Sequence, residues 1–132
     1  MSGNGTVSAA TTGTFRDQAT TWASRIGETE GVISPEELLA AAHASCFSMA
    51  FSNILAKAGT PPTRLDVEVN ISADKLEAGF TVTDSAIVVR GVVPGATQES
   101  FAAAAAEAKD GCPISRALRG NVAITVEATL ER

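Results

Sequence analysis

The chain has 132 residues, of which 45% are hydrophobic, 19% charged and 5% aromatic. This length and composition predict one globular domain, residues 1–132, whose core is packed largely by alanine. The formal net charge of −5 argues against nucleic acid and anionic membrane surfaces as partners, because both attract basic patches.

The sequence also indicates where the protein works. No apolar run approaches the roughly 20 residues of a membrane span. The first residues lack the basic segment and apolar core of a signal peptide. We therefore expect a cytoplasmic protein without a membrane partner, in a compartment where lasting structural disulfides are rare.

One long helix dominates the first half of the chain. Before it, residues 6–12 indicate a weak strand and residues 15–33 an irregular loop. Ser34 is the expected N-cap of the helix, with Glu37 completing a Ser-x-x-Glu capping box, and Gly59 is its expected stop. Apolar residues occupy nearly every side of this helix, which is typical of a helix buried at the centre of a structure.

The second half of the chain contains strands and helices in blocks. Alternating apolar and polar residues predict strands at 64–75, 79–93 and 121–132, the first two joined by a hairpin. Helices are expected at 97–111 and 112–120. This order indicates the α+β class with a mostly antiparallel sheet.

The two cysteines and the single histidine are the candidate functional residues. His43 and Cys46 lie three residues apart on one face of the long helix. Because Cys46 is in mid-helix, it gains nothing from the helix dipole, so a reactive Cys46 needs a cation from elsewhere to lower its pKa. Cys112 lies beside a helix N-terminus, which favours a thiolate.

Each of these residues also has a plain structural interpretation. Cys46 suits a small core residue, His43 a hydrogen-bonded interior imidazole, and Cys112 a small residue at a tight turn. Three soft ligands without short paired spacings argue against a metal site. From the residues alone, the cysteines are either inert core thiols or a redox pair.

The segments around both cysteines carry a family resemblance. The segment "SPEELLAAAHASCFSMAFSNILAKAG" resembles the signature helix of the OsmC/Ohr family, the osmotically inducible and organic hydroperoxide resistance proteins. Later segments of the family are similar to "AGFTVTDSAIVV" and "AKDGCPISRAL", in the same order. The resemblance extends from about residue 25 to the end, and the two cysteine segments are more similar to the OsmC branch than to the Ohr branch.

The resemblance implies a fold and an activity. The fold is an intertwined homodimer in which antiparallel sheets wrap around central buried helices, although this chain is expected to begin about one strand later than the family. The activity is that of a thiol peroxidase that reduces organic hydroperoxides in oxidative or osmotic stress defence. No cofactor is expected apart from an external thiol reductant, either a dihydrolipoyl group or a small dithiol.

The resemblance also assigns roles to individual residues. Cys46 matches the peroxidatic cysteine and Cys112 the resolving cysteine, which implies a Cys46–Cys112 disulfide. Arg25, with Arg16 as a rival, matches the arginine that supports the thiolate, and Glu36 matches the acidic residue that orients it. Ten residues of helix separate Glu36 from Cys46, about 15 Å along the axis. A kink or break could also bring them together, but no residue between them predicts one, so we expect Glu36 to serve the thiol of the partner chain.

An apolar stripe on the long helix is a candidate substrate surface. Phe47, Phe51 and Ile54 form the stripe, and Met49 flanks Cys46. Most of these residues are expected in the core. One or two of Phe47, Met49 and Phe51 are expected to line an apolar entrance for an organic peroxide.

Two other functions remain open on the sequence. The first is a non-catalytic redox-sensing or small-molecule-binding dimer of the same fold. The second is a general thiol–disulfide oxidoreductase that acts on proteins, although the chain contains no Cys-x-x-Cys.

Overall fold

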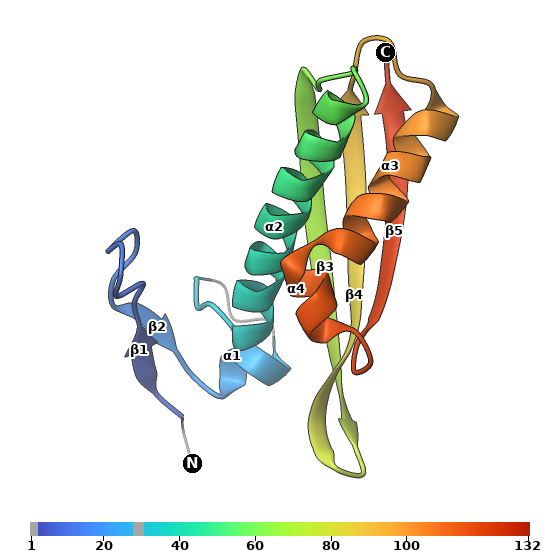
Figure 1. Cartoon of the computed structure of the whole chain (residues 1–132). Coiled ribbons are helices and arrows are strands. Elements are labelled where there is room, and N and C mark those ends of the chain that lie inside the picture. Colours follow the sequence, from blue (N-terminus) through green and yellow to red (C-terminus); the bar gives the residue numbers. More distant parts are fainter. Residues whose placement is uncertain (1–2, 28–30) are drawn as a thin grey trace. The chain divides into compact units, whose positions relative to one another are not determined.

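The computed structural model describes residues 3–27 and 31–132, and the chain forms two compact units that divide between Leu38 and Leu39. In chain order the elements are β1 (Gly5–Val7), β2 (Gln18–Thr20), α1 (Ala23–Ile26), α2 (Pro35–Lys57), β3 (Arg64–Leu76), β4 (Gly79–Val92), α3 (Gln98–Gly111), α4 (Pro113–Leu118) and β5 (Ala123–Glu131) (Figure 1). The prediction of a single domain stays a prediction.

The first unit contains a short antiparallel ladder, β1 with β2, and the single-turn helix α1. The Ser24 hydroxyl of α1 donates to the carbonyl of Thr21 at 2.7 Å and lies 3.2 Å from that of Ile33. Two of these elements, β2 and α1, fall in the segment predicted as an irregular loop, because three or four residues are too few to show a periodicity. Residues 28–30 of that segment lie outside the described residues.

Helix α2 begins and ends as the sequence predicts. The Ser34 hydroxyl accepts a hydrogen bond from the Glu37 N–H at 3.1 Å. Gly59 follows the last turn with φ of 85°, a conformation that glycine adopts without steric cost. Between these ends the helix is continuous over 23 residues.

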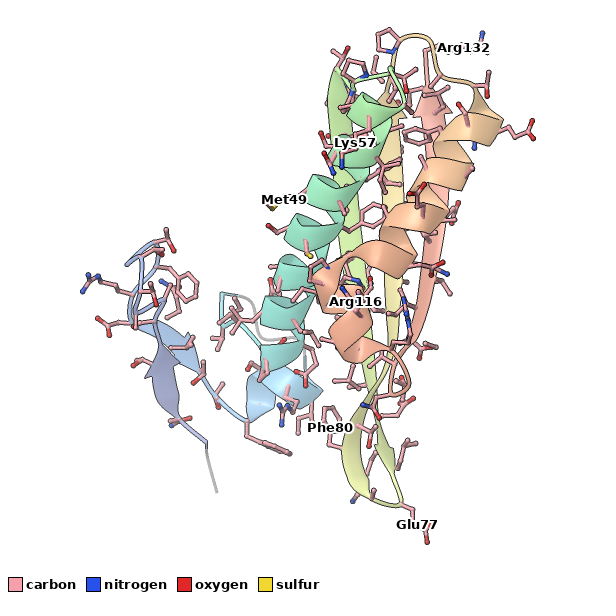
Figure 2. All side chains as sticks on the ribbon, viewed as in Figure 1. Met49, Lys57, Glu77, Phe80, Arg116 and Arg132 are labelled. Atoms are coloured by element: carbon pink, nitrogen blue, oxygen red, sulfur yellow. The ribbon has the colours of Figure 1, made fainter. Side chains whose placement is uncertain are left out.

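One face of α2 is buried and the opposite face is exposed without charge. The buried residues are Ala40, His43, Phe47, Phe51 and Leu55. The exposed residues between the two ends of the helix are Ala41, Ala42, Ser45, Met49, Asn53 and Ala56. Met49 points away from the sheet and is 72% exposed (Figure 2). A solvated helix face usually carries charged residues, so this face is unusual.

By length and composition alone, α2 is also long and apolar enough to cross a membrane, with a mean hydropathy of 1.4. The prediction that no apolar run approaches this length is therefore wrong. One such helix is weak evidence for a membrane span, since the core helix of a soluble protein passes the same test. Here, Phe47, Phe51 and Leu55 of α2 belong to a hydrophobic core.

The second unit is a three-stranded sheet in the order β3-β4-β5, with helices on one face (Figure 1). β3 and β4 form the predicted antiparallel hairpin, in which Val69 lies opposite Ile87. β5 pairs with β4 in parallel, with Val126 opposite Ile87. The sequence predicts a mostly antiparallel sheet and assigns no partner to the closing strand, which pairs in parallel. Because α3 and α4 form a crossover between β4 and β5, the chain returns to the sheet in the same direction.

Aromatic rings join α2 to α3 above the sheet. The Phe51 ring centroid lies 5.0 Å from that of Phe101 on α3 and 5.4 Å from that of Phe47. All three side chains are fully buried. Gly91 of β4 makes room for this cluster, since a Cβ at this position would lie 2.8 Å from both Phe101 Cζ and Leu65 Cδ2.

We expect Gly91→Ala to lower the free energy of unfolding by about 1–3 kcal/mol, because the added methyl group overpacks the contact between β4 and α3. Urea unfolding measures this change. Gly111→Ala is the matched control, since a Cβ there meets open space. Equal stability of the Gly91→Ala and Gly111→Ala variants would contradict the close approach of Phe101 to β4.

Candidate active site

Two cysteines from different elements lie side by side in the second unit. Cys46 on α2 is half-buried, Cys112 between α3 and α4 is fully buried, and both are free thiols. The Cys46 thiol lies close enough to the Cys112 thiol and to the backbone N–H of Ile114 for both groups to shift its pKa. The distance between the cysteines in the sequence does not indicate this proximity, which results from the packing of α4 on α2.

The surroundings of Cys46 disfavour its thiolate. Burial raises the pKa of the Cys46 thiol and the neighbouring Cys112 thiol raises it further, whereas the N–H of Ile114 acts in the opposite direction. Within the described part of the second unit, the groups that act on this pKa include no cation. Of the groups that act on the pKa of Cys46, only the N–H of Ile114 favours its thiolate.

Cys112 is held by the backbone on both sides. Its N–H donates to the carbonyl of Ala108 in the last turn of α3, at 2.9 Å, and its carbonyl accepts the N–H of Arg116 in α4, at 3.0 Å. Pro113 takes the first position of α4, where its missing N–H costs nothing. Cys112 thus closes one helix and opens the next, as its position before proline predicts.

His43 is fully buried, and both of its ring nitrogens are hydrogen-bonded. Nδ1 lies 2.7 Å from Ser85 Oγ on β4, and Nε2 lies 2.7 Å from Ser115 Oγ on α4. Burial lowers the pKa of His43, so the ring is neutral at pH 7, and one serine donates to it while the other accepts. The interior-imidazole interpretation is confirmed, and the partners of the ring are serines rather than the Cys46 thiol.

The first unit brings together the other two predicted site residues. Arg25 Nε lies 3.0 Å from Glu36 Oε1, and the two side chains are 30% and 13% exposed. The guanidinium of Arg25 also stacks over Trp22, 5.4 Å from the ring centroid. Arg16, its rival, is exposed on the segment between β1 and β2. The observed ion pair with Glu36 belongs to Arg25.

A largely apolar cavity of about 270 Å³ lies beside the Arg25 side chain. Its walls come from β1, β2, α1 and the start of α2, and include Val7, Trp22 and Leu38. The cavity therefore combines one cation with an apolar lining. This combination suits a small organic ligand with one polar group.

The four predicted catalytic residues thus form two pairs, one in each unit. Glu36 and Cys46 lie on the same continuous helix, which spans about 15 Å of axis between them. No kink or break is predicted between the two residues, and α2 contains no break in its secondary structure.

The predicted substrate-binding residues fall in different places. Phe47 and Phe51 have no exposed surface and pack in the core. Their placement favours the core interpretation over the entrance interpretation. Met49 lies on the exposed face of α2, and its role in substrate binding stays a prediction. Among residues 3–27 and 31–132, no three His, Cys, Asp or Glu side chains gather where they could hold a metal ion.

Comparison with known proteins identifies the family. The family model described as OsmC-like protein matches residues 27–127. The chain is 39% identical to the peroxiredoxin OsmC of Escherichia coli (strain K12) over 122 residues, which covers 92% of this chain and 84% of that protein. The chain belongs to the OsmC family. The resemblance of the two cysteine segments to this family is confirmed.

Two more distant relatives agree with this assignment. The organic hydroperoxide resistance protein of Xanthomonas axonopodis pv. citri (strain 306) is 28% identical over 94 residues, 70% of this chain and 64% of that protein. The crystal structure of an organic hydroperoxide resistance protein OsmC from Legionella pneumophila matches with a TM-score of 0.76 and 26% identity, over 90% of this chain and 85% of that chain. The mixed α+β fold is confirmed, and the homodimer stays a prediction.

Proposed function

We propose that the chain is a thiol-dependent peroxidase that reduces organic hydroperoxides to alcohols in defence against oxidative or osmotic stress. The contact between the Cys46 and Cys112 thiols is the observation that supports this function most directly. The names of its relatives, peroxiredoxin OsmC and organic hydroperoxide resistance protein, support the same class of activity.

In the proposed reaction, the Cys46 thiolate attacks the distal oxygen of the hydroperoxide. The O–O bond breaks, the alcohol leaves after taking up a proton, and Cys46 becomes a sulfenic acid. The Cys112 thiol then attacks the Cys46 sulfur, so that the disulfide forms and the sulfenic oxygen leaves as water. A dihydrolipoyl group or a small dithiol reduces the disulfide. The cycle uses no cofactor, and its need for thiol reductant fits the cytoplasm.

We assign the activation of Cys46 to Arg25. A cation is required because burial and the Cys112 thiol raise the pKa of the Cys46 thiol. The ion pair with Glu36 fixes the orientation of the guanidinium. Since Glu36 lies about 15 Å from Cys46 along α2, each proposed site combines the Arg25–Glu36 pair of one subunit with the thiol pair of the other.

A homodimer also accounts for the outer face of α2. This face carries small and uncharged residues, including Ala42, Ser45 and Met49, all of them exposed in the single chain. Small side chains permit close approach of a second element, and a long uncharged stripe is typical of an interface. The proposed dimer buries this face.

The first test mixes the reduced protein with cumene hydroperoxide or, separately, with hydrogen peroxide. We expect rapid loss of both thiols and of two hydrogen atoms per chain, faster with the organic peroxide, with thiol titration and intact mass as the readouts. Cys112→Ser is expected to consume about one equivalent of peroxide and stop as a sulfenic acid. Cys46→Ser is the unreactive control. Slow thiol loss with both peroxides would overturn the proposed function.

The second test measures how Arg25 affects the acidity of Cys46. Without the cation the thiolate is less stable, so the pKa of Cys46 rises in Arg25→Ala and the thiolate fraction at neutral pH falls. We expect the peroxide step to slow by about tenfold or more at pH 7 and to recover as the pH increases. Iodoacetamide alkylation of Cys46 in a Cys112→Ser background gives the pH profile. Arg16→Ala is the control, and a shift in that variant alone would assign the role to Arg16.

The third test asks whether the site is shared between subunits. A mixed dimer with Cys46→Ser in one chain and Glu36→Ala in the other has one intact site if Glu36 acts across the interface. It has none if Glu36 acts within its own chain. We therefore expect half of the wild-type activity, measured after purification through two different affinity tags. Activity no higher than that of the Glu36→Ala homodimer would rule out sharing.

A further inference from the structure

Two contacts join α2 to α4, and the proposed reaction uses only one of them. In the first contact, the Cys46 thiol lies beside the Cys112 thiol and the backbone N–H of Ile114. The second is the hydrogen bond of 2.7 Å between His43 Nε2 and Ser115 Oγ. The reaction assigns no role to His43, although it is the single histidine of the sequence and fully buried.

The two contacts have matching spacing along both elements. His43 precedes Cys46 by three residues on α2, and Ser115 follows Cys112 by three residues at the start of α4. Residues three apart lie about one turn from each other on the same side of a helix. The thiol contact and the imidazole contact therefore attach α4 to α2 at two points, which fixes both its position and its rotation.

Helix α4 depends on the second contact for its place. It has six residues, fewer than an isolated helix needs to be stable. Its apolar residues Ile114 and Leu118 are only half-buried, whereas Ser115 is 1% exposed. The buried hydroxyl on the imidazole, rather than a large apolar side chain, is the deepest attachment of α4.

The sheet fixes the imidazole in turn. Ser85 of β4 is fully buried and its Oγ lies 2.7 Å from His43 Nδ1. The ring thus has a partner on each nitrogen, one from the sheet and one from α4. Burial lowers the pKa of His43, which keeps the ring neutral and able to both donate and accept.

We propose that His43 is a positioning residue for the second step of the reaction, acting through Ser115 to hold Cys112 against Cys46. This inference rests on the proposed peroxidase function. In that step the Cys112 sulfur attacks the sulfenic sulfur of Cys46. The S–S bond forms and the S–O bond breaks, and the Cys112 proton leaves with the hydroxyl group as water. His43 touches none of the reacting atoms, and the first step, at Cys46 alone, does not require it.

Two substitutions of His43 separate its two hydrogen bonds. His43→Gln places an amide near the position of Nε2 and keeps the link to Ser115. His43→Asn places the amide near Nδ1 and keeps only the link to Ser85. Ser115→Ala removes the α4 link from the other side. Ser48→Ala is the matched control, because the Ser48 hydroxyl donates to the Ala44 carbonyl at 2.7 Å within α2 itself.

The experiment follows both steps after rapid mixing with cumene hydroperoxide. Dimedone quenching and intact mass separate the thiol, sulfenic, disulfide and sulfinic forms at each time. We expect disulfide formation to slow by about tenfold or more in His43→Asn and Ser115→Ala, with sulfenic acid formation unchanged. The long-lived sulfenic acid should then proceed to sulfinic acid in excess peroxide. The His43→Gln and Ser48→Ala variants should form the disulfide at the wild-type rate.

If His43→Asn and Ser115→Ala form the disulfide at the wild-type rate, the proposal is overturned. Equal slowing of both steps in His43→Gln and His43→Asn, with equally lowered melting temperatures, would reduce His43 to a stabilising role and overturn it too. If His43→Asn does not fold, the smaller change Ser115→Ala decides. If the wild type forms no sulfenic acid, the peroxidase function fails, and the rate of disulfide formation with diamide then tests the positioning by itself.

Discussion

The burial of one face of α2 against the sheet is the constraint on which the second unit depends. Phe47 and Phe51 fix the height and rotation of the helix, and their contact with Phe101 brings α3 alongside it. Cys46 lies at the margin of this buried face, deep enough to reach α4 and shallow enough to remain half-exposed. Because Cys112 directly follows α3, the aromatic cluster that positions α3 in the core also positions the second thiol.

In the proposed function, the two units supply different parts of the chemistry. The second unit places two thiols in contact but leaves Cys46 in surroundings that favour its protonated form. In the first unit, the guanidinium of Arg25 forms an ion pair with the carboxylate of Glu36 and lies over the ring of Trp22. Among the described residues, the groups that shift the pKa of Cys46 include no cation. In the proposed dimer, the Arg25–Glu36 pair of one subunit activates the thiol pair of the other, and the activity depends on assembly.

Part of this organisation could be predicted from the sequence. The ends of α2 were predictable because Ser34 and Gly59 are local signals, and the strands of the second unit because periodicity survives in long segments. The direction of β5 was not predictable, because apolar and polar residues alternate in the same way in parallel and antiparallel strands. Two features were anticipated only through the family resemblance: the proximity of the two thiols and, separately, the ion pair between Arg25 and Glu36. The partners of His43 had no signal at all, because Ser85 and Ser115 are ordinary residues until the fold brings them together.

In the proposed cycle, the unequal burial of the two cysteines sets the direction of the return half. Cys112 is fully buried, whereas Cys46 remains half-exposed on α2. An incoming thiolate can reach only the outer sulfur of a disulfide placed in this way, so Cys112 is the leaving group. The transient mixed disulfide with the reductant therefore forms on Cys46. In this proposed cycle, the Cys46 sulfur reacts first with the oxidant and then with the reductant, while Cys112 stays in the protein interior.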